Sequence, residues 1–237
     1  MNRFEPRIEV AVARVRAEVA RLHKLLVRGG LATWTSGVVS GRVPDSELFV
    51  IKPGGLDHSE LAPDNMVLVD LDGNVVDGTP GAEHPPTRGV TVHAALYRHS
   101  DAIGGIVHTH SPYVTSFAIA NKPIEPTYEA MVRFDINEAV PVAAYGARGS
   151  ERSVSNIIDV VNDTNKAVLL ANHGLLAFDD TLEKATHLVF VLEEAAQFSL
   201  MANVIGGAQA LPPEAIRQTQ ERRVEFERAG VVSADDE

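Results

Sequence analysis

Two histidines at the end of an apolar, strand-like run constrain the fold of this chain more than any other feature. The run is Gly104-Gly105-Ile106-Val107-His108-Thr109-His110, and a third histidine, His173, follows the apolar run Ala167-Val168-Leu169-Leu170-Ala171. Alternate side chains of a strand share one face, so His108 and His110 can point into the same space. A fold that places the ends of these two runs side by side brings three imidazoles together.

Three imidazoles can serve as the ligand set of a catalytic metal ion, with the fourth position open for water or substrate. An isolated His-x-His pair is more often a surface pair or a hydrogen-bonded core pair. Here the apolar residues before each histidine indicate strands that come out of the core, and Gly174 permits a close approach of the backbone beside His173. The chain has no cysteine, so the ligands would be nitrogen and oxygen, which suits zinc, manganese or iron(II).

Length and charge limit the class of protein. The 237 residues contain no Pro/Gly/Ser-rich linker, which predicts a single domain over 1–237, with a core at about 8–206 and a C-terminal helix and tail at 212–237. The net charge of -11 argues against nucleic acid or an anionic membrane as a partner. No uncharged apolar run approaches the roughly 20 residues that span a bilayer, and the N-terminus does not resemble a signal peptide. We expect a soluble, cytoplasmic protein.

Hydrophobic periodicity predicts helices interleaved with short strands. Helices are expected at about 8–28, 91–99, 113–120, 150–163, 181–204 and 212–228, and strands at 48–51, 66–69, 75–76, 105–109, 140–142, 167–171 and 175–178, with a frayed end at 231–237. Several of the strands are joined by turns of hairpin length. This order predicts an α/β fold, a three-layer α/β/α sandwich around a mixed, largely antiparallel central sheet.

Several motifs, in this order along the chain, resemble the class II aldolase/adducin family over roughly Leu22 to Gly206. They are Thr35-Ser36-Gly37-Val38-Val39-Ser40, Val50-Ile51-Lys52-Pro53-Gly54-Gly55, Pro86-Thr87, His93 to Tyr97, Gly105 to Pro112, and Asn172-His173-Gly174. The family includes L-fuculose-1-phosphate aldolase and L-ribulose-5-phosphate 4-epimerase. The resemblance implies a divalent metal ion at His108, His110 and His173, and a homotetramer whose active sites lie near subunit borders.

The chain departs from this family at the positions that carry its sugar-phosphate chemistry. Where such members have a Pro-Ser-Ser-acid segment, this chain has Pro86-Thr87-Arg88-Gly89, so the acid is replaced by Gly89 and the second hydroxyl by Arg88. The asparagine that contacts phosphate corresponds to Val38. The epimerase's catalytic aspartate has no clean match, although Asp135 lies one position away.

These departures favour a different substrate. Loss of the acid leaves a more strongly Lewis-acidic ion and removes the obvious base for aldol chemistry. We therefore expect an unphosphorylated carboxylate substrate, bound by a pocket that is cationic on one side and apolar on another. The residues expected to bind it are Val38, Lys52, Thr87, Arg88 and Gly89.

The group that moves the proton is not fixed by the sequence. Catalytic candidates are Arg88 and three residues of one loop, Tyr128, Glu129 and Asp135, any of which can be the proton donor. Glu83 can replace the missing acid. His93 is expected to be structural, and His23, His58, His99 and His187 are expected at the surface.

Four functions fit these features. The favoured one is a metal-dependent carbon–carbon lyase acting as a decarboxylase. Its carboxylic acid substrate can be aromatic and hydroxylated, because Val38 offers an apolar wall for a ring. The alternatives are a sugar-phosphate aldolase or L-ribulose-5-phosphate 4-epimerase-like enzyme, a non-haem iron oxygenase, and an adducin-like interaction module. Retention of all three histidines argues against the last.

Overall fold

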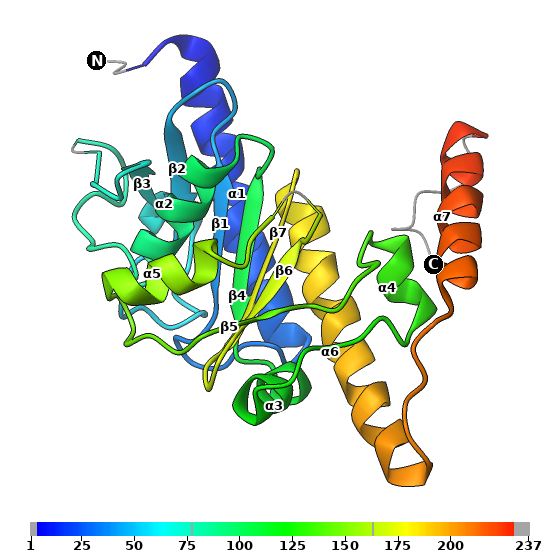
Figure 1. Cartoon of the computed structure of the whole chain (residues 1–237). Coiled ribbons are helices and arrows are strands. Elements are labelled where there is room, and N and C mark those ends of the chain that lie inside the picture. Colours follow the sequence, from blue (N-terminus) through cyan, green and yellow to red (C-terminus); the bar gives the residue numbers. More distant parts are fainter. Residues whose placement is uncertain (1–3, 77, 163, 230–237) are drawn as a thin grey trace.

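A seven-stranded sheet forms the centre of the molecule, with the spatial order β3-β2-β1-β4-β7-β6-β5 (Figure 1). It is seen in a computed structural model that describes residues 4–76, 78–162 and 164–229. Neighbouring strands pair antiparallel except β5 and β6, which are parallel. The strands are β1 (Val38–Arg42), β2 (Leu48–Ile51), β3 (Val67–Asp70), β4 (Gly105–Thr109), β5 (Val142–Ala143), β6 (Ala167–Leu170) and β7 (Gly174–Asp179).

Helices cover both faces of this sheet and complete the predicted three layers. Helices α1, α3 and α6 pack on one face, α2 and α5 lie together on the other, and α4 and α7 lie outside α6 (Figure 1). The helices are α1 (Pro6–Arg28), α2 (Val90–His99), α3 (Pro112–Ala120), α4 (Glu129–Arg133), α5 (Glu151–Ile158), α6 (Leu182–Ile205) and α7 (Pro213–Arg228), with a short 3-10 turn η1 (Pro63–Asn65).

Alternation along the strands divides the core into two apolar layers. Val107 and Leu175 belong to the layer under α1 and α6, whereas Ile106 and Leu176 belong to the layer under α2 and α5. Side chains two positions apart on a strand share a face. His108 therefore lies on the same side of the sheet as Ile106, the side that carries α2 and α5.

Three expected elements differ in the structure. The expected strand at 75–76 is reduced to one bridge, between Val69 and Val75. Helix α5 ends at Ile158 rather than near residue 163, and the strand expected at 140–142 is β5 at Val142–Ala143. The expected frayed end at 231–237 lies outside the described residues.

Helix α6 is, by length and composition, apolar enough to cross a membrane, which the sequence analysis did not anticipate. Its N-terminal part packs on β4 and β7, and Leu188, Val189 and Leu192 are fully buried. The N-terminal part of α6 is therefore a core helix of the domain.

Two of the histidines expected at the surface are buried. His23 is completely inaccessible, and it accepts a hydrogen bond from the Val39 backbone N–H at 3.0 Å while its Nδ1 donates to the Val19 carbonyl at 2.8 Å. His58 is 4% exposed, and its Nε2 donates to the Ser36 carbonyl at 2.6 Å. The expectation was wrong because both rings hold backbone groups around the start of β1.

Candidate metal centre

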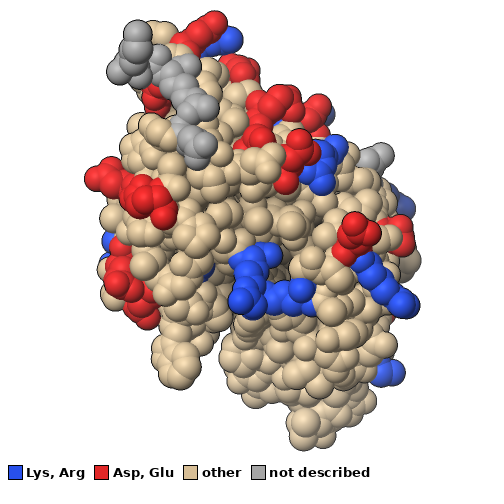
Figure 2. Space-filling model, turned by 90° about the vertical axis from the view of Figure 1, so that its left-hand side faces the viewer, with Lys and Arg blue, Asp and Glu red and all other residues tan. Residues whose placement is uncertain are grey.

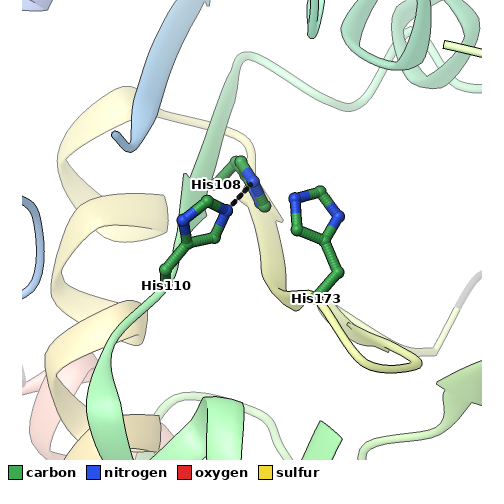
Figure 3. Close-up of side chains that lie close together, drawn as sticks. All are labelled: His108, His110 and His173. Atoms are coloured by element: carbon green, nitrogen blue, oxygen red, sulfur yellow. Dashed lines mark hydrogen bonds between the residues drawn. The ribbon is translucent and has the colours of Figure 1, made fainter. Parts of the chain in front are cut away.

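The structure brings His108, His110 and His173 into one cluster (Figure 3). The ring centroids are 4.8, 4.8 and 4.9 Å apart, so the three rings form a nearly equilateral triangle. One ligand nitrogen from each ring lies within 4.8 Å of the others, and the Nε2 atoms of His108 and His110 are 3.0 Å apart. Among the described residues, no carboxylate belongs to this cluster.

Backbone contacts fix the rings in this arrangement. The Nδ1 of His108 donates to the Leu175 carbonyl at 2.8 Å, which leaves Nε2 as the nitrogen that faces the cluster. A Cβ on Gly174 would lie 2.3 Å from the Thr109 carbonyl oxygen, so only glycine lets the turn with His173 approach β4 this closely. The close approach predicted for Gly174 is therefore observed.

Burial keeps the imidazoles neutral. It lowers the pKa of His108 well below its usual range and the pKa of His173 to about 4, and it also lowers the pKa of His110. Neutral imidazole is the form that binds a metal ion, so protons do not compete for these nitrogens near pH 7. The three donors thus fit a divalent ion with open coordination positions.

The segments expected to bind the substrate meet next to this cluster. The Gly54 backbone N–H donates to the Pro85 carbonyl and the Thr87 N–H to the Lys52 carbonyl, which places residues 52–54 beside 85–87. A Cβ on Gly89 would lie 3.9 Å from Val38 Cγ2, and Val38 pairs with His108 between β1 and β4.

The two expected cations of these segments differ in burial. Arg88 is exposed and makes no hydrogen bond or ion pair with a described residue. Lys52 is 1% exposed, and its ammonium donates to the Thr35 carbonyl at 2.6 Å. Burial lowers the pKa of Lys52 to about 8, and the positive charge of Arg148 contributes.

Arg148 was missed by the sequence analysis. It is an exposed residue of the loop between β5 and α5, and its charge acts to lower the pKa of His110, of His173 and of Lys52, in each case secondary to burial. No sequence motif marks Arg148. Its loop reaches the end of the sheet near the cluster only because β5 pairs in parallel with β6, and this pairing cannot be read from the local sequence.

His93 stands beside the cluster but is held by other groups. It is 1% exposed, its Nδ1 is 2.7 Å from Ser40 Oγ, and that hydroxyl lies 2.9 Å from the Tyr97 hydroxyl. Burial lowers the pKa of His93 to about 3. This hydrogen-bonded position agrees with the structural role expected for it.

Within the chain, the structure does not bring the three expected loop residues to the histidines. The Asp135 carboxylate binds Arg223 at 2.6 Å and Lys166 at 3.1 Å, and Lys166 also binds Asp179. Asp179 ends β7, whereas Gly174 beside His173 begins it, so Asp135 lies toward the opposite end of the sheet.

Tyr128 and Glu129 begin α4, which packs on α6 and α7. The Tyr128 ring meets Phe198 edge-on at 5.4 Å, and burial together with a hydrogen bond to Glu194 raises its pKa. Glu129 is exposed. Glu83, considered as a replacement acid, is exposed and pairs with His84 at 3.5 Å.

A three-histidine cluster that could hold a metal ion lies at the end of a mixed sheet between helical layers, which defines an α/β protein with a candidate metal centre. The model of the class II aldolase and adducin N-terminal domain family matches residues 17–200, and the chain belongs to this family.

Curated relatives include an aldolase and an epimerase. The chain is 30% identical to a 5-deoxy-D-ribulose 1-phosphate aldolase of Bacillus thuringiensis serovar kurstaki, covering 84% of this chain and 90% of the relative. It is 31% identical to the L-ribulose-5-phosphate 4-epimerase UlaF of Salmonella paratyphi B, over 77% of this chain and 82% of the relative.

Two solved structures share the fold over most of the chain. An L-fuculose 1-phosphate aldolase is 30% identical with a TM-score of 0.78, covering 88% of this chain and 95% of its own. YgbL of Klebsiella pneumoniae, assigned provisionally as an aldolase, epimerase or decarboxylase, is 27% identical with a TM-score of 0.77, covering 88% of this chain and 98% of its own.

Proposed function

We propose that this protein is a divalent-metal-dependent carbon–carbon lyase that decarboxylates an unphosphorylated carboxylic acid. The observation that carries the proposal is a cluster of three neutral imidazoles that has no acidic member among the described residues. The segments of Lys52 and Arg88 pair with each other, and Gly89 lies against Val38, the strand partner of His108. Zinc or manganese suits these ligands, and iron(II) suits them as well. When bound to His108, His110 and His173, the ion would supply a Lewis acid that draws electrons from a substrate oxygen.

The chain's own residues would bind and orient the substrate. Lys52 and Arg88 would hold its carboxylate, and the Thr87 hydroxyl would add a hydrogen bond. Val38 offers an apolar wall for the remainder of the molecule. Because Gly89 has no side chain, there is room between Val38 and His93. A Cβ at this position would make only ordinary van der Waals contact with them.

Decarboxylation requires little else from the protein. The bond to the carboxyl carbon breaks, its electron pair stays on the substrate, and a proton must then reach that carbon. No base is needed for the first step, which agrees with a cluster that contains no carboxylate from the part of the chain that the structure describes. Tyr128, Glu129 and Asp135 remain candidates for the proton donor, and they would have to act on the site of a neighbouring subunit.

A sugar-phosphate aldolase or epimerase is the second candidate function, and the names of the relatives favour it. In that enzyme Lys52, Arg88 and Thr87 would hold a phosphate, and an acid from outside the cluster would move the proton. A third candidate is an iron oxygenase, because a three-histidine site leaves positions for dioxygen.

One set of assays separates these functions. Protein loaded with zinc, manganese or iron(II) is incubated with hydroxylated aromatic acids, 3-oxo acids, and fuculose and ribulose phosphates. Carbon dioxide release, retro-aldol or epimer product, and oxygen uptake are then followed. We expect metal-dependent carbon dioxide release that is abolished in His108→Ala and by chelation. Release that survives both changes, or turnover of the sugar phosphates alone, would rule out the proposed decarboxylase.

We also propose that the protein is a homotetramer in the cytoplasm. Support for association comes from the C-terminal half of α6, where Met201, Val204 and Ile205 are 58%, 83% and 88% exposed. Apolar faces of this kind on a monomer commonly mark an interface.

A further inference from the structure

We propose that Arg148 is a substrate-binding residue of the candidate metal centre, where its guanidinium holds an anionic group of the substrate beside the three histidines. The inference deepens the proposed function and rests on it, because it names a group that would recognise that enzyme's substrate.

The sheet topology places the loop that carries Arg148 at the same end of the sheet as His173. Strands β5 and β6 are parallel, with Ala143 opposite Leu170, and the Ala171 backbone N–H donates to the Ala143 carbonyl at 3.1 Å. Parallel neighbours leave a sheet at the same end. The chain after β6 carries His173 and the chain after β5 carries Arg148, so the two segments lie side by side where the sheet ends.

The loop that carries Arg148 is anchored on both sides. Asn156 donates from Nδ2 to the carbonyls of Ala144 and Tyr145 at 3.0 and 3.2 Å. A Cβ on Gly146 would lie 2.5 Å from Ser153 Cα, so this part of the loop packs directly on α5. Downstream of Arg148, the Ser150 hydroxyl caps α5 by accepting from the Ser153 backbone N–H.

The charge of Arg148 has no protein counterion among the described residues. Arg148 is exposed and makes no hydrogen bond or ion pair with them, yet its charge acts on Lys52, His110 and His173. The groups on which this charge acts are two imidazoles and a second cation, none of them an acid, so an anion bound between them would balance the charge.

The face of the molecule that carries α2 and α5 has basic side chains beside a hollow near its middle, with acidic side chains toward the periphery (Figure 2). A basic area beside a hollow, on a chain of net charge -11, attracts an anion locally. A planar guanidinium binds carboxylate and phosphate alike through two parallel hydrogen bonds, so the shared chemistry is an oxyanion.

Calorimetric titration of the zinc-loaded protein tests the assignment with three probes: 3,4-dihydroxybenzoate, catechol and inorganic phosphate. The first two share a ring and differ in the carboxylate. In Arg148→Gln we expect the affinity for the recognised oxyanion to fall about 10- to 100-fold and the affinity for catechol to stay unchanged. Arg148→Lys should recover part of the loss, because it restores the charge without the planar fork.

The matched control is Arg152→Gln, which removes another exposed arginine four positions away at the start of α5. It should bind all three probes as the parent does. Equal affinities for both oxyanions in Arg148→Gln and the parent, or an equal loss for catechol, would overturn the assignment. Arg148-dependent binding of phosphate alone would keep Arg148 as the anion-binding residue while rejecting the decarboxylase, so the two proposals fail separately.

Discussion

At the scale of residues, the metal centre depends on which nitrogen each imidazole presents. The His108 ring is oriented by the Leu175 carbonyl, and His173 is delivered by a turn that requires Gly174. Loss of one ligand should therefore reduce the affinity for zinc strongly. We expect His173→Ala to bind zinc at least about 100-fold more weakly in a chelator competition, since loss of a supporting partner alone costs 10- to 100-fold. The control His99→Ala changes an exposed histidine and should bind zinc as the parent does; equal affinity in both variants would refute the ligand assignment.

Lys52 gives the site a dependence on pH. Its pKa is lowered to about 8 because burial disfavours the charged ammonium. Affinity for an oxyanion should be constant below about pH 8 and fall as the ammonium loses its proton above it. Lys52→Met should be weaker at neutral pH and lack this decline, which binding titrations at pH 6.5 to 9.5 would detect. A parent protein with unchanged affinity across this range would contradict the role of Lys52.

The lowered pKa of Lys52 also makes the free energy of unfolding depend on pH. The unfolded chain holds the Lys52 proton up to about pH 10.5, so between about 8 and 10.5 the unfolded state binds more protons than the folded one. The contribution of Lys52 to the free energy of unfolding therefore rises with pH through this window.

Trp34 shows backbone strain beside the site. Its φ is 53°, a left-handed conformation that is rare for a bulky residue, and its side chain is 85% exposed. Trp34→Gly should raise the free energy of unfolding by about 1 kcal/mol, because glycine adopts this conformation without a steric cost. Trp34→Ala removes the indole but keeps the Cβ, so it should bring no gain. Thermal unfolding followed by circular dichroism measures the stability of both variants. Equal midpoints for Trp34→Gly and the parent would show that the left-handed backbone at residue 34 has no net cost.

At the scale of elements, local patterns predicted most of the fold. The apolar stripe of α1, the histidine strand and the continuous apolar run that forms β6 can each be recognised within a single segment. Pairing across the sheet has no such signal. The parallel pairing of β5 with β6 rests on a two-residue strand, and it brings the loop that carries Arg148 to the end of the sheet where His173 lies. His23 and His58 were misjudged for the same reason, since their burial depends on backbone groups distant in sequence.

The Asp135 carboxylate links helix α7 to the segment that follows α4. Asp135 accepts from both terminal nitrogens of Arg223, at 2.6 and 2.8 Å, and from Lys166, all three side chains being partly buried. Asp135→Asn should release α7 from α4, seen as faster hydrogen exchange over 213–228, with zinc affinity unchanged. Arg223→Met should release the helix equally while keeping the carboxylate. Full activity in Arg223→Met with loss in Asp135→Asn would assign a catalytic role to Asp135, and equal activities would leave it a structural one.

At the scale of the whole molecule, the end of α6 extends away from the sheet (Figure 1) and leaves apolar side chains uncovered. If a neighbouring subunit covers them, a charge placed there should break the assembly. We expect the parent to run as a tetramer in light-scattering chromatography and Val204→Glu to run as a smaller species. Val10→Glu makes the same chemical change at another exposed valine, 70% accessible on α1, and should stay tetrameric.

Because Tyr128, Glu129 and Asp135 do not reach the histidines within one chain, Val204→Glu should also lose activity while retaining zinc. A Val204→Glu protein that is dissociated but fully active would show that each chain holds a complete site, and the proton donor would then have to be sought among residues near Lys52 and Arg148.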